Sequence, residues 1–292
     1  ASLGYWSLSG NTTGNYNTAL GSRALTANTT ASNNTAVGYQ SLHANTTGGN
    51  NTALGYSALA TNITGNYSTA LGYRALTTTT AGNNTAVGHD ALYLTTTGDA
   101  NVAVGVGALD ANTTGANNTG LGWGALGLNT TGADNIAIGR DSVRSNTTAS
   151  GNVGIGIDAL YTNTTGADNV AVGFQALSTN NGDNNTAVGN EAMEANTTGA
   201  SNTAVGGDTL GTNTSGANNT AVGQGALFYN TTASNNTAVG KSALVANTTG
   251  TRNVAVGALA LDANTVGGEN VAMGMDALGT NVDGNRSVAI GD

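Results

Sequence analysis

The chain has 292 residues and a net charge of −9 at pH 7, from 7 basic and 16 acidic side chains, and it contains neither cysteine nor proline. This acidic balance argues against binding to nucleic acid phosphates, which requires basic patches, and the lack of cysteine excludes disulfides and thiolate metal sites. No run approaches the roughly 18 apolar residues of a membrane helix, so we expect no membrane insertion in this segment.

A glycine recurs every 17 residues along the chain, except for two steps of 16 residues. We count this glycine as position 0 and name each coil by it. It stands at Gly4, Gly21, Gly38, Gly55, Gly72, Gly88, Gly105, Gly122, Gly139, Gly156, Gly173, Gly189, Gly206, Gly223, Gly240, Gly257, Gly274 and Gly291. A fixed short period is the signature of a solenoid. We therefore expect one continuous repeat domain, residues 1–292, of about 17 coils.

Each coil is expected to contain two short strands. Positions −4 to −1, first complete at residues 17–20, alternate with the period of a strand. We place positions −3 and −1, which are Thr or aliphatic, toward the core and the small residue at −2 on the other side. A second strand from +2 to +6 would point its Leu at +4 inward, and the Asn-Thr-Thr-Gly loop follows from +7. The sequence thus predicts an all-β parallel β-solenoid, or β-roll.

Two asparagine columns, at positions −4 and +7, carry the most specific structural signal. Stacked coils place like residues directly above like, so Asn amides can bond one another along the axis or satisfy backbone groups at a turn. The predicted Asn ladders include Asn17, Asn34, Asn51, Asn84, Asn101 and Asn118 at −4, and Asn11, Asn28, Asn45 and Asn62 at +7.

Two further columns are candidates for contacts outside the coil. The small residues at −2 occupy strand positions, which favours a close-packing surface between subunits; they include Ala19, Ala36, Ala53, Ala70, Ala86 and Ala103. Aromatic residues at +1 can contact a ligand or an interface, and contact with the next coil's turn is an equally good interpretation. They are Tyr5, Tyr39, Tyr56, Tyr73, Trp123 and Phe174.

Catalysis would have to break the repeat, because chemistry needs particular groups at one place. His43 and His89 stand at different repeat positions, +5 and +1, and we interpret both as ordinary surface histidines. The acidic residues at +2, such as Asp90 and Asp141, favour a solvated face. Phosphate-loop, metalloprotease and calcium-roll motifs are absent. We therefore expect no enzyme activity, no catalytic or metal site and no cofactor.

The run Ser287-Val288-Ala289-Ile290-Gly291 resembles the head repeat of YadA-like trimeric autotransporter adhesins, and so does Asn253-Val254-Ala255-Val256-Gly257. Similar repeats occur in tail-fibre-like surface proteins of bacteria. The resemblance covers the whole chain, which departs from the head pattern in its longer unit and its Asn-Thr-Thr-Gly loop. It implies a left-handed parallel β-roll, three chains packed side by side, and an extracellular position on the bacterial cell surface.

These observations favour a structural extracellular fibre or adhesin segment, a rigid head or stalk for attachment. The expected partners are the chain itself, as a homotrimer or a head-to-tail polymer, and host or surface glycans or proteins. We expect the first and last coils to contact further protein in the working assembly, because neither has the atypical sequence of a capping unit. The alternative function is ice binding by stacked Thr rows at +8 and +9, although the deletions in that loop argue against a flat, uninterrupted surface.

Overall fold

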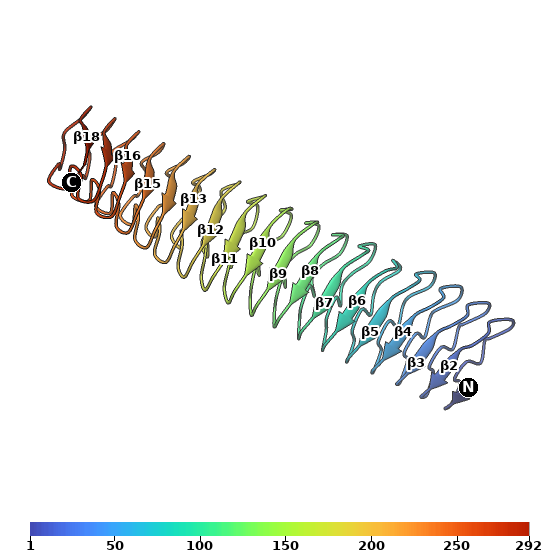
Figure 1. The fold of residues 1–292 in the computed structure, drawn as a ribbon. Helices are drawn as coiled ribbons and strands as arrows, with labels where there is room; N and C mark the ends of the chain where they lie inside the picture. Colours follow the sequence, from blue (N-terminus) through green and yellow to red (C-terminus); the bar gives the residue numbers. More distant parts are fainter. Residues whose placement is uncertain (292) are drawn as a thin grey trace. The chain divides into compact units, whose positions relative to one another are not determined.

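The computed structural model describes residues 1–291 and is an all-β parallel β-solenoid of about 17 coils, each of about 17 residues (Figure 1). No helix occurs among these residues. The chain divides into two compact units, Ala1–Ala149 and Ser150–Asp292. Within each unit, every coil contributes one strand to a parallel sheet.

The first unit contains nine strands that pair in sequence order and in register, so that Ala36 lies opposite Ala53 and Thr35 opposite Thr52. They are β1 (Ser2–Leu3), β2 (Thr18–Leu20), β3 (Thr35–Val37), β4 (Thr52–Leu54), β5 (Thr69–Leu71), β6 (Thr85–Val87), β7 (Val102–Val104), β8 (Thr119–Leu121) and β9 (Ile136–Ile138). The register holds across the shortened coil that precedes Gly88, where Ala70 still pairs with Ala86. The missing residue is therefore absorbed by the loop, as a solenoid requires.

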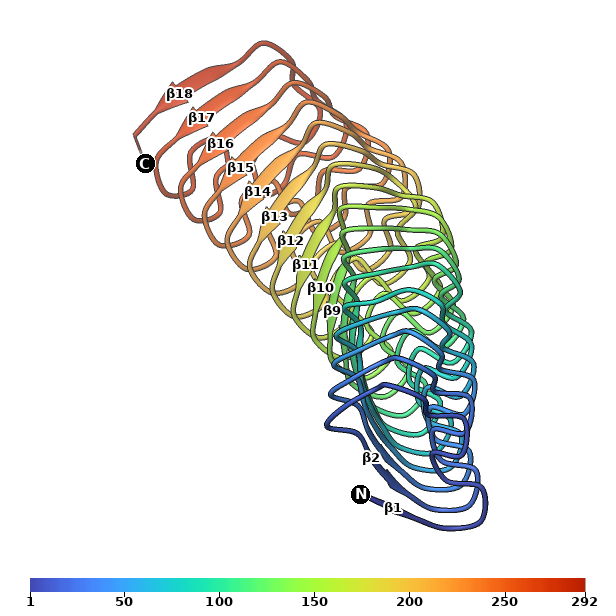
Figure 2. The same ribbon diagram turned by 90° about the vertical axis from the view of Figure 1, so that its right-hand side faces the viewer.

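The second unit repeats this arrangement, and its strands follow one another along one side of the coils (Figure 2). They are β10 (Val153–Ile155), β11 (Val170–Val172), β12 (Thr186–Val188), β13 (Thr203–Val205), β14 (Thr220–Val222), β15 (Thr237–Val239), β16 (Val254–Val256), β17 (Val271–Met273) and β18 (Val288–Ile290). Here too a shortened coil keeps the register, because Ala171 pairs with Ala187.

The second strand that we predicted in each coil is wrong. Positions +1 to +6 form turns, in which the residues at +2 and +4 have left-handed backbone, as at Arg23 (φ 58°) and Leu25 (φ 52°). Left-handed residues at every second position prevent the extended conformation of a strand. The coils nevertheless remain linked here, because the Leu25 amide donates to the Ser41 carbonyl at 2.9 Å and the Ala27 amide to that of His43 at 3.1 Å.

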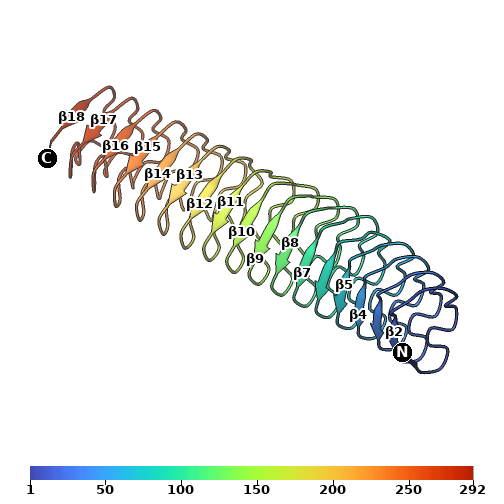
Figure 3. The ribbon, with the colours of Figure 1, turned by 45° about the vertical axis from the view of Figure 1, so that its right-hand side comes forward.

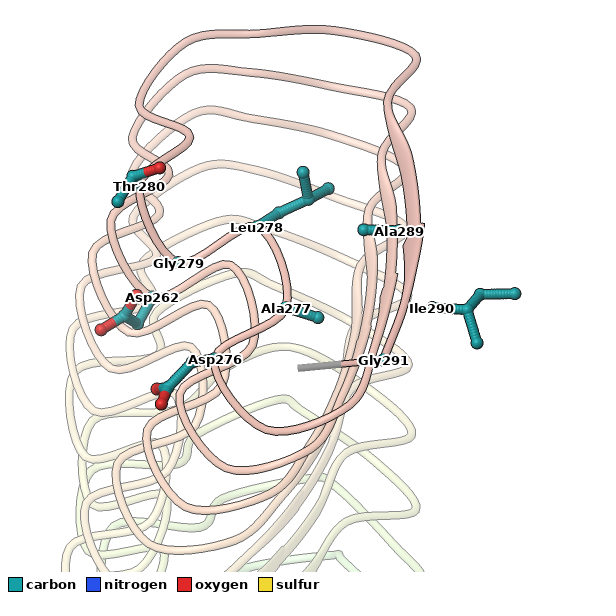
Figure 4. A pocket seen from close by; sticks show the side chains of 9 residues that line it. All are labelled: Asp262, Asp276, Ala277, Leu278, Gly279, Thr280, Ala289, Ile290 and Gly291. Atoms are coloured by element: carbon teal, nitrogen blue, oxygen red, sulfur yellow. The ribbon is translucent and has the colours of Figure 1, made fainter.

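The predicted orientation of the first strand is also wrong, since Ala at −2 lies inside the coil and the aliphatic residue at −1 lies outside. Ala36 and Ala53 have no exposed surface, whereas Leu54 is 46% exposed. Figure 4 shows Ala289 pointing toward Leu278 within the coil and its neighbour Ile290 pointing away.

The reason for this reversal is the narrow space between the strand and the turn segment opposite it. Leu at +4 is fully buried in most coils, as predicted, and already fills that space. A Cβ added at Gly120, which takes the place of the usual Ala at −2, would lie 3.5 Å from Leu109 Cδ1, in ordinary van der Waals contact. Only a small residue fits against the leucine there. The alanines, including Ala19, Ala36, Ala53, Ala70, Ala86 and Ala103, are therefore core residues and cannot form the subunit surface that we predicted.

The interior of each coil is unusually polar for a protein core. It contains Asn at −4 and +7, Ala at −2, Ala or Ser at +3 and Leu at +4 in most coils, all fully or almost fully buried. The outer face of the strands holds the Thr, Val, Ile and Leu of positions −3 and −1. Figure 3 shows the strands aligned on one side of the coils in each unit.

Glycine at position 0 is required by the close stacking of the coils. Gly38 has a φ of 127°, in a region that side chains rarely adopt. A Cβ at this residue would lie 2.4 Å from the carbonyl oxygen of Gly55 in the next coil. Backbone conformation and spacing both exclude any other residue, which explains why the repeat is marked by this glycine.

Candidate functional site

The Asn ladder at +7 forms along the axis, as predicted. Asn28 Nδ2 donates to Asn11 Oδ1 at 2.7 Å, Asn45 Nδ2 to Asn28 Oδ1 at 3.1 Å, and Asn62 Nδ2 to Asn45 Oδ1 at 2.9 Å. Each amide also closes its own turn, because Asn45 Nδ2 donates to the Gly48 carbonyl at 2.9 Å. The column thus satisfies a buried turn and links it to the neighbouring coil.

The Asn column at −4 is buried too, but its amides bond mainly to backbone. The Asn34 backbone amide donates to Asn17 Oδ1 at 2.9 Å, and Asn34 Nδ2 donates to the Gly48 carbonyl of the following loop at 2.9 Å. Both groups of the side chain therefore satisfy backbone that would otherwise be buried without a partner. These two columns are structural elements of the coil.

Two threonines interrupt the +7 ladder in the first unit. Thr79 and Thr95 stand in place of Asn, and both are fully buried. The Thr95 hydroxyl has no hydrogen-bond partner. Such a group lowers stability, because it loses its bonds to water without gaining others.

The Thr residues at +8 use their hydroxyls within the chain. Thr113 Oγ1 donates to the Thr130 carbonyl at 2.9 Å, and Thr130 Oγ1 to the Thr147 carbonyl at 2.8 Å. The same bond recurs in the second unit, where Thr197 Oγ1 donates to the Thr214 carbonyl at 2.8 Å. Their donor is therefore already engaged, which weakens the case for an ice-matching surface at +8.

The aromatic residues at +1 stack on one another where they are consecutive. The ring centroids of Tyr39 and Tyr56 are 5.3 Å apart, those of Tyr56 and Tyr73 are 5.2 Å apart, and those of Tyr73 and His89 are 4.9 Å apart. These rings therefore contact the rings of the neighbouring coils, which cover much of their faces. The predicted ligand contact through ring faces is thus disfavoured for this row, while edges and hydroxyls remain outward.

The other predicted +1 aromatics have different surroundings. Tyr5 stacks on Trp6 at 4.9 Å within its own coil. Trp123 is 51% exposed, and the Arg144 guanidinium lies 5.3 Å from its ring centroid. Phe174 is 43% exposed in the second unit. Of these three residues, Trp123 is the one whose ring lies beside a guanidinium.

Two ion pairs flank Trp123 along the coils. Arg74 binds Asp90 in bidentate fashion, with Nε to Oδ1 at 2.8 Å and Nη2 to Oδ2 at 2.7 Å, and its guanidinium lies over the Tyr93 ring. Arg144 Nη1 donates to Asp141 Oδ1 on the other side. Sequence reasoning treated the acidic +2 column as a solvated face and missed this cluster. The sequence did contain a signal, because the basic residues are unevenly distributed. Three of the seven, Arg74, Arg140 and Arg144, fall within the five successive coils from Gly72 to Gly139.

The outward strand face presents a row of exposed apolar side chains in each unit. In the second unit, Val205, Val222 and Val239 at −1 are 36–37% exposed in successive coils. A contiguous row of exposed apolar side chains marks an interaction surface. Positions −3 and −1 were expected to face the core, so the sequence did not predict this exposed surface.

Residues 1–291 contain no candidate metal site and no candidate membrane helix. No three His, Asp or Glu side chains in that range gather closely enough to hold a metal ion. None of its segments is a helix with the length and apolar character needed to cross a membrane. No protein-family model matches this chain, and no curated protein matches it significantly. The resemblance to YadA-like heads accordingly rests on the repeat residues themselves.

Proposed function

We propose that this chain is a structural and binding segment of an extracellular bacterial fibre or adhesin, related to YadA-like heads, in which three left-handed β-rolls pack side by side. The observation that carries the proposal is the outward strand face. Positions −3 and −1 expose Thr, Val, Ile and Leu, while the interior is occupied by Asn, Ala and the Leu at +4. An isolated chain would gain nothing from turning its larger apolar side chains to water.

A second copy of the same face is the natural cover for this surface. The face is regular, because its residues repeat in register from strand to strand, as Val205, Val222 and Val239 do. Its side chains carry no charge, and charged side chains are what commonly protect exposed sheets from association. We therefore assign the subunit interface to positions −3 and −1, in place of the buried alanines.

Stiffness would come from the ladders that run through each unit. Backbone bonds between strands, Asn bonds at +7 and Thr bonds at +8 connect most pairs of neighbouring coils within each unit. A structure held at three places around each coil resists bending and local opening. Such a scaffold suits attachment, with the variable residues at +1, +2 and +5 as the candidates for receptor contact.

Introduction of positive charge on the apolar face tests the assembly. We expect the purified chain to have three times its monomer mass of 28.5 kDa by light scattering. The triple variant Val205→Lys, Val222→Lys and Val239→Lys should be monomeric, because three lysines per chain cannot be buried without partners. The matched control places lysines in the same unit on exposed loop residues, Thr198→Lys, Ser215→Lys and Thr232→Lys.

The control variant should assemble as the parent chain does. A parent chain that is monomeric at micromolar concentration would exclude the trimer. Equal dissociation of both variants would show that added charge alone, and not the strand face, is responsible. Far-UV circular dichroism establishes that each variant is folded before its mass is interpreted.

A further inference from the structure

A hollow of about 300 Å³ lies in the first unit, over residues at positions +1, +2, +5 and +6 of four successive coils, those of Gly88, Gly105, Gly122 and Gly139. Its volume is at the lower end of the range for small-molecule sites, about 300–1,000 Å³. It lies on the turn segment of the coils, away from the apolar strand face. A subunit interface at positions −3 and −1 would therefore leave it accessible.

Missing side chains create this hollow. Position +2 is Gly in two successive coils, at Gly107 and Gly124, and position +5 is Gly127 between them and Arg144. In no other coil are both +2 and +5 glycine. The depression is therefore specific to this place in the repeat.

The backbone alone does not demand glycine at these positions. Gly107 has a φ of 64°, close to the 56° of Gln40 and the 56° of Asp90 at the same repeat position. The two glycines differ in the space that a side chain would have. A Cβ on Gly124 would come within 2.7 Å of Asp141 Oδ1, whereas a Cβ on Gly107 would meet nothing nearer than Asp110 Oδ2 at 4.0 Å. Gly107 thus leaves open space.

Charged side chains bound the hollow at both ends and are held in place. Asp90 is fixed by Arg74 and lies 3.2 Å from His89 Nδ1. Arg144 is fixed by Asp141 and by the Trp123 ring. Groups that are already oriented lose little entropy when a ligand binds. Together they offer N–H donors and carboxylate acceptors around an exposed indole.

Asp110 has a different environment, because it enters no ion pair among residues 1–291. Its carboxylate lies beside the floor of the hollow, with Oδ1 placed 3.6 Å from where a Cβ on Gly127 would stand. Burial raises the pKa of Asp110, and the Arg144 charge offsets this only in part. A half-buried carboxylate without a counter-ion lowers stability, and such groups are common at binding sites.

We propose that this hollow binds one sugar ring of a neutral saccharide, with the Asp110 carboxylate and the Arg144 guanidinium bonding its hydroxyls beside the Trp123 ring. Sugar hydroxyls both donate and accept, which matches a site that presents carboxylate oxygens and N–H groups together. The apolar faces of a sugar suit an exposed aromatic ring. The inference rests on the proposed attachment function, for which it supplies the ligand class.

A small organic cation is the competing ligand, since carboxylates and an indole also attract ammonium groups. The structure favours the saccharide, because Asp90 and Asp141 are already neutralised by Arg74 and Arg144. Asp110 is then the carboxylate of the lining that has no ion pair, and the Arg144 charge already offsets its charge in part.

Tryptophan fluorescence tests the proposal in the full chain. The chain has two tryptophans, and Trp6 stacks on Tyr5 outside the hollow, so Trp6→Phe leaves Trp123 as the sole indole reporter. The probes are methyl α-D-glucopyranoside, methyl β-D-galactopyranoside and N-acetyl-D-glucosamine, with tetramethylammonium chloride as the cation. We expect a saturable change in Trp123 emission with at least one sugar and none with the cation.

A matched pair of variants locates the binding. Gly107→Gln fills the hollow with a residue that the repeat accepts at this position, and it should weaken binding by about tenfold or more, that is by about 1.4 kcal/mol. Gly225→Gln makes the same change at the same repeat position in the second unit, where a Cβ would lie 3.7 Å from Ser242 Oγ. It should leave the affinity unchanged. Asp110→Asn should also weaken binding, because an amide oxygen accepts fewer bonds than a carboxylate.

Three results would overturn the inference: no saturable change with any sugar, equal affinity for parent and Gly107→Gln, or saturation by tetramethylammonium alone. Light scattering on the same samples separates this inference from the proposed assembly. A trimer that binds no sugar removes the site and leaves the fibre proposal standing. A monomer that binds sugar retains the site and removes the trimer.

Discussion

Replacing Asn129 by alanine tests whether the +7 ladder stabilises the coils. Asn129 is fully buried in the first unit. Its Nδ2 donates to Asn112 Oδ1 at 2.9 Å and to the Gly132 carbonyl at 2.9 Å, and its Oδ1 accepts from Asn146 Nδ2 at 2.7 Å. Asn129→Ala removes all three bonds together.

The magnitude follows from what remains after the change. Gly132 keeps a bond from Asn118 Nδ2, and Asn146 keeps one to the Ala149 carbonyl. Each lost bond costs about 1 kcal/mol, and Asn112 Oδ1, now buried without a donor, adds about 1–2 kcal/mol. We expect the free energy of unfolding to fall by about 3–5 kcal/mol.

Urea denaturation followed by far-UV circular dichroism measures this loss. The control is Thr131→Ala, which removes an exposed side chain from the same loop and should change stability by less than about 0.5 kcal/mol. A solenoid can unfold in parts, so the comparison uses the transition of the first unit if two transitions are resolved. A loss below about 1 kcal/mol for Asn129→Ala, or an equal loss for both variants, would refute the ladder's contribution.

Three further outcomes are expected. Thr95→Asn should raise the urea midpoint by an amount equivalent to about 1 kcal/mol, because it replaces an unpaired hydroxyl with an amide that can join Asn112; a lower midpoint would contradict this. Asp110→Asn should stabilise the chain at pH 7, and this gain should fade as pH falls. The pKa of Asp110 is raised in the folded state, so ionisation of its carboxyl lowers the stability of the parent chain once the pH exceeds the pKa of Asp110 in the unfolded chain. A gain that is the same at pH 7 and pH 3 would be inconsistent with that sign. The parent chain should show no thermal hysteresis in ice-growth measurements, because the +8 hydroxyls donate within the chain; measurable hysteresis would restore the ice-binding alternative.

The architecture could be predicted from the sequence because the repeat specifies it. The period, the glycine at 0, the strand before it and the axial bonds of Asn28 and Asn45 all follow from like residues stacking on like. The shortened loops were also interpretable, since a residue can be lost only where no register depends on it. These features depend on spacing more than on side-chain chemistry.

The inside and outside of the strand could not be predicted, because hydrophobicity pointed the wrong way. Val37 and Leu54 are the more apolar residues, yet Ala36 and Ala53 are the buried ones. The width of the coil determines which face of the strand is buried. That width depends on the turn segment with its left-handed residues, which we predicted to be a strand. The Trp123 cluster was missed for a similar reason, since its members are far apart in sequence and only the stacking brings them together.

The polar interior has a thermal consequence. Most coils bury two asparagine amides together with alanines, where most proteins bury larger aliphatic groups. Exposure of apolar surface raises the heat capacity on unfolding, whereas exposure of polar surface lowers it. The heat capacity change of this chain should thus lie below the usual value of about 12–15 cal/mol/K per residue. Its stability then varies little between cold and warm surroundings, because the term that curves the stability profile with temperature is small.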